Sequence, residues 1–311
     1  MKNTIQYKLL LLLFITAIIR ANLREINPWY SDKPLDKNII NIENLDWMKN
    51  LKDNIDIREL AIPGTHDSCT SKFVNSKLYI NIGYRCQSWT IEEQLIAGIR
   101  YFDLRPAGSG VIYHVIGKTN YSINSIFEIF KNFLNEHPSE GLIVRIQFQN
   151  KTYGDNYEII EENSPKKEIY KALEDYKDII YWDNSVPNVG KIRKKIFAIL
   201  EYVEYKNLLI WDNNDLMELQ DYFRLKGVKK FELEKKKNLV KKYLFNTNKN
   251  KLIINHCSAV GRRIYTLNKD VACIINKVPY KENSFRGILI FDFPGEELIN
   301  HVINQNERFF K

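Results

Sequence analysis

The sequence predicts a single α/β domain, and our first choice is a closed or slightly open barrel of TIM type. Roughly seven or eight short apolar runs lie along the 311 residues, several of them separated by amphipathic helical patterns, which is typical of parallel βαβ units. With 44% hydrophobic residues the chain can bury a full core, and no low-complexity linker or internal repeat divides it. An open doubly wound sheet is the second choice, because the runs are irregularly spaced.

The N-terminus has the pattern of a secretory signal peptide. Residues 9–19 form an apolar run that follows Lys2 and Lys8 and is too short to span a bilayer. Ala21 offers a cleavage point, so we expect residues 1–21 to be removed and the mature protein to be secreted; an uncleaved signal anchor is the alternative. Cleavage removes Lys2, Lys8 and Arg20 and no acidic residue, which lowers the formal charge from +8 to +5.

The four cysteines permit two disulfides in an exported chain, with three possible pairings. Our first guess joins Cys69 to Cys86, because both flank the segment after the first predicted strand. Together with Cys257 and Cys273 they match no zinc-binding spacing.

The first half of the chain begins with an arm and continues into alternating strands and helices. Residues 22–44 form the N-terminal arm, and the barrel domain runs over residues 45–311, starting with a helix that contains Trp47 and Met48. Strands are predicted at 60–62, 99–104 and 111–115. Helices are predicted at 90–97, where Thr90 and Glu93 form a capping box, and at 125–136, where Ser125 and Glu128 form another.

The second half continues the pattern to the C-terminus. A helix begins at Pro165 with Ser164 as its cap, and a lysine-rich helix occupies 228–244. The lysines most simply form a solvent-exposed face, and contact with anionic lipid is the alternative. Strands are predicted at 142–148, 195–200, 208–211, 252–254 and 288–291.

Side chains capable of acid–base chemistry follow several of these strands. His66 and Asp67 follow the first strand, Asp103 and Arg105 end the second, and His114 lies near the end of the third. Asp292 shares a face of the last strand with core residues, so its carboxylate needs a buried partner. Because a barrel closes its last strand beside its first, we expect Asp292 to orient His66.

Two histidines with an arginine between them suit the cleavage of a phosphodiester. One histidine accepts a proton from an attacking hydroxyl, the other donates one to the leaving oxygen, and Arg105 stabilises the phosphoryl group. The other histidines are weaker candidates. His137 lies in a His-Pro pair at a helix end, His301 lies in a C-terminal helical stretch, and His256 after a strand is ambiguous.

Three ordered motifs resemble the X domain of phosphatidylinositol-specific phospholipases C. They are Ile62–Ser68 (IPGTHDS), Gly98–Arg105 (GIRYFDLR) preceded by Gln94-Leu95, and Tyr113-His114. The similarity continues through Phe133–Glu140, Gln220–Tyr222 and Ile288–Asp292, and it covers about residues 45–305.

The resemblance implies a distorted, incompletely closed TIM barrel that releases diacylglycerol and an inositol cyclic phosphate, with the inositol 2-hydroxyl as the attacking group. It also implies roles for six residues. His66 would be the general base, paired with Asp292, and His114 the general acid, supported by Asp67 and Asp103. Arg105 would bind the phosphate. Calcium-dependent members carry an acidic metal ligand at the Arg105 position, so the chain is similar to the metal-independent bacterial branch, and we expect no metal or cofactor.

The expected headgroup pocket departs from the family pattern. Gln147 stands where the bacterial enzymes carry an inositol-contacting lysine, and Glu201 stands where they have an arginine, for which Arg193 or Lys195 is a possible substitute. Asp221 and Tyr222, or Phe223 in its place, match an aspartate and a stacking aromatic within one position. We therefore expect Gln147, Arg193, Asp221 and Tyr222 to bind substrate.

The overall expectation is a secreted, monomeric phosphodiesterase that acts on an inositol phospholipid at a membrane surface and binds no nucleic acid. One alternative keeps the enzyme class and changes the substrate to a glycosylated inositol lipid or another phosphodiester headgroup. Another is a non-catalytic lipid-binding protein on the same barrel. A metal-dependent glycerophosphodiesterase would need a cluster of acidic ligands, which Arg105 interrupts.

Overall fold

The computed structural model describes residues 27–36, 41–74, 83–149, 151–153, 159–161, 166–213, 215–226, 230–261 and 267–310. The expected signal peptide, residues 1–21, lies outside these ranges, as does the predicted helix start at Ser164 and Pro165. None of the helices within them is long and apolar enough to cross a membrane.

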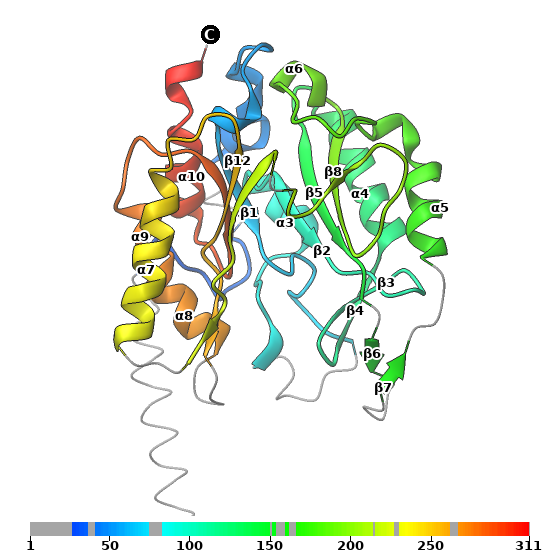
Figure 1. Ribbon diagram of the computed structural model, residues 1–311, viewed down its shortest axis with the longest axis horizontal. Helices are drawn as coiled ribbons and strands as arrows, with labels where there is room; N and C mark the ends of the chain where they lie inside the picture. Colours follow the sequence, from blue (N-terminus) through cyan, green and yellow to red (C-terminus); the bar gives the residue numbers. More distant parts are fainter. Residues whose placement is uncertain are drawn as a thin grey trace, which may run out of the picture.

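One eight-stranded parallel sheet curls into an incomplete barrel at the centre of the fold (Figure 1). Its first and last strands in the sequence lie side by side, as predicted, and pair in parallel from Ala61–Gly287 to Thr65–Phe291. Between β9 and β10 no ladder is found in the described ranges, so the barrel is open there. The strand order is β10 (Met217–Gln220), β12 (Leu252–His256), β14 (Gly287–Phe291), β1 (Ala61–Thr65), β2 (Tyr101–Leu104), β5 (Leu142–Gln147), β8 (Ile196–Glu201), β9 (Leu209–Ile210).

This topology confirms the barrel prediction and excludes the open doubly wound sheet. Helices cover the outer face of the sheet, with α4 and α5 on one side and α7, α9 and α10 on the other (Figure 1). They bury apolar stripes against it, as α4 does with Phe127, Phe130 and Leu134. The helices are α3 (Ile91–Ile96), α4 (Ile123–Glu136), α5 (Lys167–Asp175), α6 (Val189–Ile192), α7 (Lys230–Leu244), α8 (Asn268–Ile275), α9 (Lys277–Tyr280) and α10 (Glu296–Asn304).

The predicted third strand is not part of the barrel. Val111–His114 (β3) pairs antiparallel with Gly117–Ser122 (β4) in a hairpin outside the main sheet. Its side chains are mostly half-buried, whereas a strand inside a parallel barrel is buried on both faces. Two further small sheets join β6 (Lys151–Tyr153) to β7 (Ile159–Glu161) and β11 (Arg224–Leu225) to β13 (Val260–Gly261).

Local boundaries also differ from the predictions. The helix predicted at 125–136 starts earlier, because Ser122 is its N-cap and forms the capping box with Ser125. The segment around Trp47 is a 3₁₀ helix, η1 (Ile42–Asn50), that is interrupted by non-helical dihedral angles at Asp46. The other 3₁₀ helices are η2 (Ile57–Glu59), η3 (Lys177–Ile179) and η4 (Glu307–Phe309).

The predicted disulfide between Cys69 and Cys86 is wrong, since both residues are buried free thiols, as is Cys257. Cys69 packs in the main hydrophobic core. The sulfur of Cys86 instead accepts a hydrogen bond from Asn268 Nδ2 at 3.2 Å and lies 3.9 Å from His114 Nδ1. The two side chains therefore occupy different surroundings.

Candidate active site

A cavity of about 390 Å³ opens at the carboxyl ends of the barrel strands. Its lining includes His66, Arg105, His114 and Asp292, which sequence reasoning placed at the ends of separate strands. Two of the four predicted substrate-binding residues, Gln147 and Asp221, also line it.

The end of β1 is held rigidly before it presents His66. Gly64 is required there, because a Cβ at this position would lie 2.8 Å from the Cβ of Tyr101 on the neighbouring strand. Thr65 donates a side-chain hydrogen bond to Gln94 at 2.7 Å, and the backbone N–H of His66 donates to Phe291 at 2.9 Å. The backbone of Asp67 then turns with φ of +44°. The turn leaves His66 in the cavity lining and Asp67 buried beside it.

His66 is oriented by the last strand of the barrel, as the sequence predicted. Its Nδ1 donates to Asp292 Oδ1 at 2.8 Å, which leaves Nε2 facing Asp67 Oδ2 at 3.2 Å. Burial alone would lower the pKa of His66, but the Asp67 and Asp292 carboxylates outweigh it and raise this pKa above its usual value. A carboxylate on Nδ1 fixes the tautomer in which Nε2 can accept a proton.

Arg105 is held by two buried carboxylates. Its Nε lies 3.0 Å from Asp67 Oδ1, and its Nη2 lies 2.9 Å from Asp103 Oδ2. Burial opposes ionisation of Asp103, but Arg105 and Arg145 outweigh it and hold the pKa of this carboxyl far below its usual value. The guanidinium is thus a fixed positive charge in the cavity wall, suited to a phosphate.

His114 reaches the site from the β3–β4 hairpin. Its Nδ1 donates to the carbonyl of Tyr84 at 2.7 Å, and its Nε2 lies 3.2 Å from Asp67 Oδ2. The centroids of the His66 and His114 rings are 6.2 Å apart. Burial lowers the pKa of His114, and the charge of Arg105 lowers it further. Because Nδ1 already donates its proton to Tyr84, a second proton on this ring would sit on Nε2, where it can be donated.

Arg145, on β5, lines the cavity and was missed by the sequence reasoning. It donates through Nε to Glu201 at 2.8 Å, contacts Asp103 at 3.5 Å, and its guanidinium lies 4.1 Å from the centroid of the Trp211 ring. The sequence could have revealed Arg145 as a candidate site residue, because it is a charged residue within the apolar run of 142–148, two residues before Gln147. Glu201, noted as a departure from the family pattern, is its partner.

His256 forms another part of the wall. It ends β12, its ring centroid lies 6.1 Å from that of His66, and its buried Nε2 has no hydrogen-bond partner within the described ranges. Burial lowers its pKa to about 3, so the ring is neutral at physiological pH. Beneath it, the buried Lys236 donates to its backbone carbonyl at 2.6 Å. This lysine comes from the helix that was predicted to expose its lysines, and burial lowers its pKa to about 8.

Two predicted substrate-binding residues lie elsewhere. Arg193 donates to Asp53 at 2.7 Å and to the backbone carbonyls of Met48 and Ser139, at the amino ends of the strands. Arg193 precedes β8 and so lies at the opposite end of the barrel from the cavity. This position contradicts the prediction that Arg193 binds substrate. Tyr222 donates to Glu232 at 2.5 Å and is not among the cavity-lining residues.

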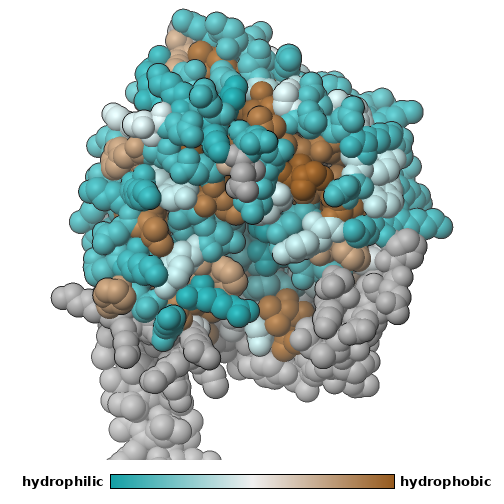
Figure 2. All heavy atoms as spheres, in the orientation of Figure 1, coloured by the Kyte–Doolittle hydropathy of each residue, from teal (hydrophilic) through white to brown (hydrophobic). Residues whose placement is uncertain are grey.

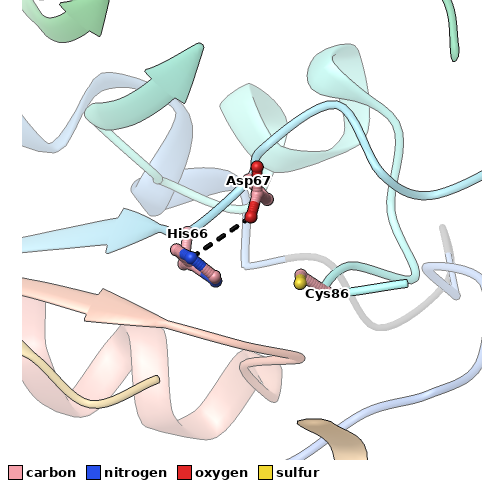
Figure 3. Close-up of side chains that lie close together, drawn as sticks. All are labelled: His66, Asp67 and Cys86. Atoms are coloured by element: carbon pink, nitrogen blue, oxygen red, sulfur yellow. Dashed lines mark ion pairs between the residues drawn. The ribbon is translucent and has the colours of Figure 1, made fainter. Parts of the chain in front are cut away.

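One group of potential metal ligands occurs among the described residues. His66, Asp67 and Cys86 each offer one ligand atom, and these atoms lie within 4.8 Å of one another. Figure 3 shows the three side chains bordering one space, with the Asp67 carboxylate directed at the His66 ring.

Comparisons with known proteins agree with this fold. The chain is 28% identical over 332 aligned residues to a 1-phosphatidylinositol phosphodiesterase of Listeria monocytogenes, covering 98% of this chain and 99% of the relative. A protein of the same name from Staphylococcus aureus (strain Newman) is 20% identical over 84% of this chain and 94% of the relative. The solved structure of phosphatidylinositol-specific phospholipase C from Listeria monocytogenes superposes with a TM-score of 0.70 and 26% identity, over 85% of this chain and 98% of that one. No protein-family model matches the chain.

Proposed function

The chain belongs to the bacterial phosphatidylinositol-specific phospholipase C family, and we propose that it cleaves an inositol phospholipid to diacylglycerol and an inositol cyclic phosphate. The observation that carries the proposal is the convergence of two histidines and one arginine on a single cavity. His66, its partner Asp292, Arg105 and His114 come from four separate parts of the chain.

The reaction begins at His66. Nε2 of this ring accepts the proton of the inositol 2-hydroxyl as its oxygen attacks the phosphorus, while Asp292 stabilises the resulting imidazolium. The bond from phosphorus to the glycerol oxygen then breaks, and His114 Nε2 supplies the proton that this oxygen takes up. Arg105 offsets the charge that develops on the phosphoryl oxygens. Each acid–base role contributes about 10²–10⁴-fold in rate.

Attack requires a neutral His66 and a protonated His114, whereas the pKa shifts of the empty cavity favour protonation of His66. We propose that the bound substrate reverses this order. Its anionic phosphate lies beside Arg105 and offsets the guanidinium charge that lowers the pKa of His114. Asp67 Oδ2 lies 3.2 Å from Nε2 of both rings, which couples their protonation.

The headgroup is expected to extend from the phosphate toward β12. Along the sheet, His66 after β1 lies between Arg105 after β2 and His256 on β12. A ring whose phosphate contacts Arg105 and whose 2-hydroxyl contacts His66 therefore places its remaining hydroxyls toward His256 and Asp221. Both line the cavity.

We also propose that the cavity mouth contacts the membrane surface peripherally. Val115 and Phe223 line the cavity and are 45% and 43% exposed, and the basic Arg224 follows Phe223. Hydrophobic side chains are otherwise scattered over a mostly hydrophilic face (Figure 2). Loss of vesicle binding in a V115A/F223A double variant would support this contact. An I42A variant is the matched control, because Ile42 is 79% exposed at the other end of the barrel.

Secretion is part of the same proposal, and it rests on the apolar run of residues 9–19 behind Lys2 and Lys8. The mass of the protein recovered from culture medium tests it. We expect a chain that begins near residue 22, and recovery of the full-length chain from the membrane fraction would favour the signal anchor.

The decisive experiment incubates the mature protein with phosphatidylinositol vesicles in EDTA and follows the cyclic phosphate by ³¹P NMR. We expect product from the wild type and a loss of at least 10²-fold in H66A and H114A. H137A is the control, because this histidine pairs with Asp46 far from the cavity. Absence of product from any inositol lipid, with vesicle binding retained, would favour the lipid-binding alternative, and activity that requires calcium would contradict the role of Arg105.

A further inference from the structure

Cys86 borders the space between His66 and Asp67 without a part in the proposed reaction (Figure 3). We propose that His66 Nε2, Asp67 Oδ2 and Cys86 Sγ form an inhibitory binding site for a thiophilic divalent cation such as Zn²⁺ or Cd²⁺. The inhibition rests on the proposed function, whereas the binding does not.

The donor set suits such an ion. Zinc takes imidazole nitrogen, thiolate sulfur and carboxylate oxygen at about 2.0–2.3 Å in tetrahedral geometry, which places neighbouring ligand atoms roughly 3.3–3.8 Å apart. His66 Nε2 and Asp67 Oδ2 are already 3.2 Å apart. All three ligand atoms lie within 4.8 Å, so a shift of about 1 Å in the Cys86 side chain completes three-fold coordination. Water fills the fourth position.

A second observation points to a missing partner at this site. When His66 and His114 are both neutral and donate through Nδ1, Asp67 Oδ2 is a buried oxygen with no hydrogen-bond donor within the described ranges. A buried acceptor that lacks a hydrogen bond costs about 1–3 kcal/mol. The oxygen lies 3.2 Å from Nε2 of both His66 and His114. An ion bound to it would therefore contact the His66 ring and lie near the His114 ring. A cation on this oxygen removes the cost.

The charges around the site favour a cation despite Arg105. Asp67, Asp103 and Asp292 are three buried carboxylates next to this one guanidinium. Two further charges nearby, Arg145 and Glu201, form a pair with each other. The immediate surroundings therefore carry an excess of negative charge. Because Arg105 lies 3.0 Å from the second oxygen of Asp67, we expect weaker binding than at a structural zinc site.

Cys86 is held in position by its backbone. Its N–H donates to Thr70 Oγ1 at 3.0 Å, its carbonyl accepts from the N–H of Phe293 at 2.9 Å, and Asn268 donates to its sulfur at 3.2 Å. Burial raises the pKa of the thiol, so the sulfur is protonated in the empty protein. Binding replaces the S–H bond by a sulfur–metal bond and releases that proton to solvent, together with the Nε2 proton of His66 when this ring is protonated. The ion also occupies Nε2 of His66, which blocks the proposed general base.

The test compares Zn²⁺ inhibition of the wild type with that of C86S and C86A, each measured relative to its own rate in EDTA. At a zinc concentration that reduces the wild-type rate tenfold, we expect both variants to retain more than half of theirs, and excess EDTA to restore the wild type. C257S is the matched control, because Cys257 is another buried free thiol, and it should stay as sensitive as the wild type. Equal inhibition of C86S, C86A and wild type would overturn the proposal.

A spectroscopic measurement separates this proposal from the proposed function. Thiolate coordination to Cd²⁺ produces an ultraviolet charge-transfer absorption that needs no substrate. We expect this band at one Cd²⁺ per chain in wild type and C257S, and its absence in C86S and C86A. A protein with no phosphodiesterase activity that still shows the band would contradict only the proposed function. A band that survives in C86A, or none in the wild type, would refute the metal site.

Discussion

Replacing Asp292 with asparagine tests whether the last strand of the barrel acts through His66. The substitution keeps the size of the side chain and an oxygen that can accept from His66 Nδ1, but it removes the charge 2.8 Å from that nitrogen. At an effective dielectric constant of about 20, two unit charges at this distance interact by roughly 6 kcal/mol, part of which the burial of the carboxylate offsets. We therefore expect kcat to fall by about 10²–10⁴-fold, equivalent to about 3–5 kcal/mol.

The pH dependence gives this prediction a direction. Proposed turnover needs a neutral His66, so the rate rises with pH as His66 loses its proton. Asp292 is one of the groups that raise the pKa of His66, so D292N should move this rise to lower pH as well as lowering the plateau. Stopped assays on phosphatidylinositol vesicles over a pH series measure both effects.

Two comparisons make the D292N result specific. D46N is the matched control, because Asp46 forms a similar pair with His137 Nδ1 at 2.9 Å at the other end of the barrel, and it should leave kcat and the pH profile unchanged. H66A and H66A/D292N should have equal rates if Asp292 works through His66. The reasoning is refuted if D292N keeps the wild-type plateau and pH profile, or if D292N reduces the rate of H66A by a further 10²-fold.

Three further predictions concern buried groups. H256A should raise KM for phosphatidylinositol about tenfold with kcat within about twofold, because it removes one neutral hydrogen bond to the headgroup; an unchanged KM contradicts that contact. Lys236 has a pKa of about 8 in the folded protein, below its usual value of 10.5, so the unfolded chain binds more protons between these pH values. Wild-type stability relative to K236M should therefore rise by roughly 3 kcal/mol from pH 7.5 to 10.5 in urea titrations, and a constant difference refutes the shift. E140Q should lower the free energy of unfolding by about 3–5 kcal/mol, since it leaves the guanidinium of Arg100, now 2.9 Å from Glu140, buried without its counter-charge; a loss below 1 kcal/mol would contradict this.

The sequence by itself determined the barrel and the residues at its strand ends. Short apolar runs followed by His66, Arg105 and Asp292 are local patterns, and the rule that a barrel closes its last strand beside its first was enough to predict the His66–Asp292 contact. The same local reasoning failed where a segment was apolar but only half-buried. Val111–His114 forms a hairpin instead of a barrel strand, although it still delivers His114 to the cavity.

Only the tertiary structure decided which charges meet inside the barrel. Arg145 turns toward Glu201 and Trp211, and Arg193 lies at the wrong end to touch substrate. Lys236 turns inward under His256, whereas the neighbouring Lys235 is exposed. Hydrophobic periodicity shows which side of an element is buried, because burial of apolar surface acts on each element locally. The pairing of charges depends instead on distances between residues far apart in the chain, and these distances exist only in the folded protein.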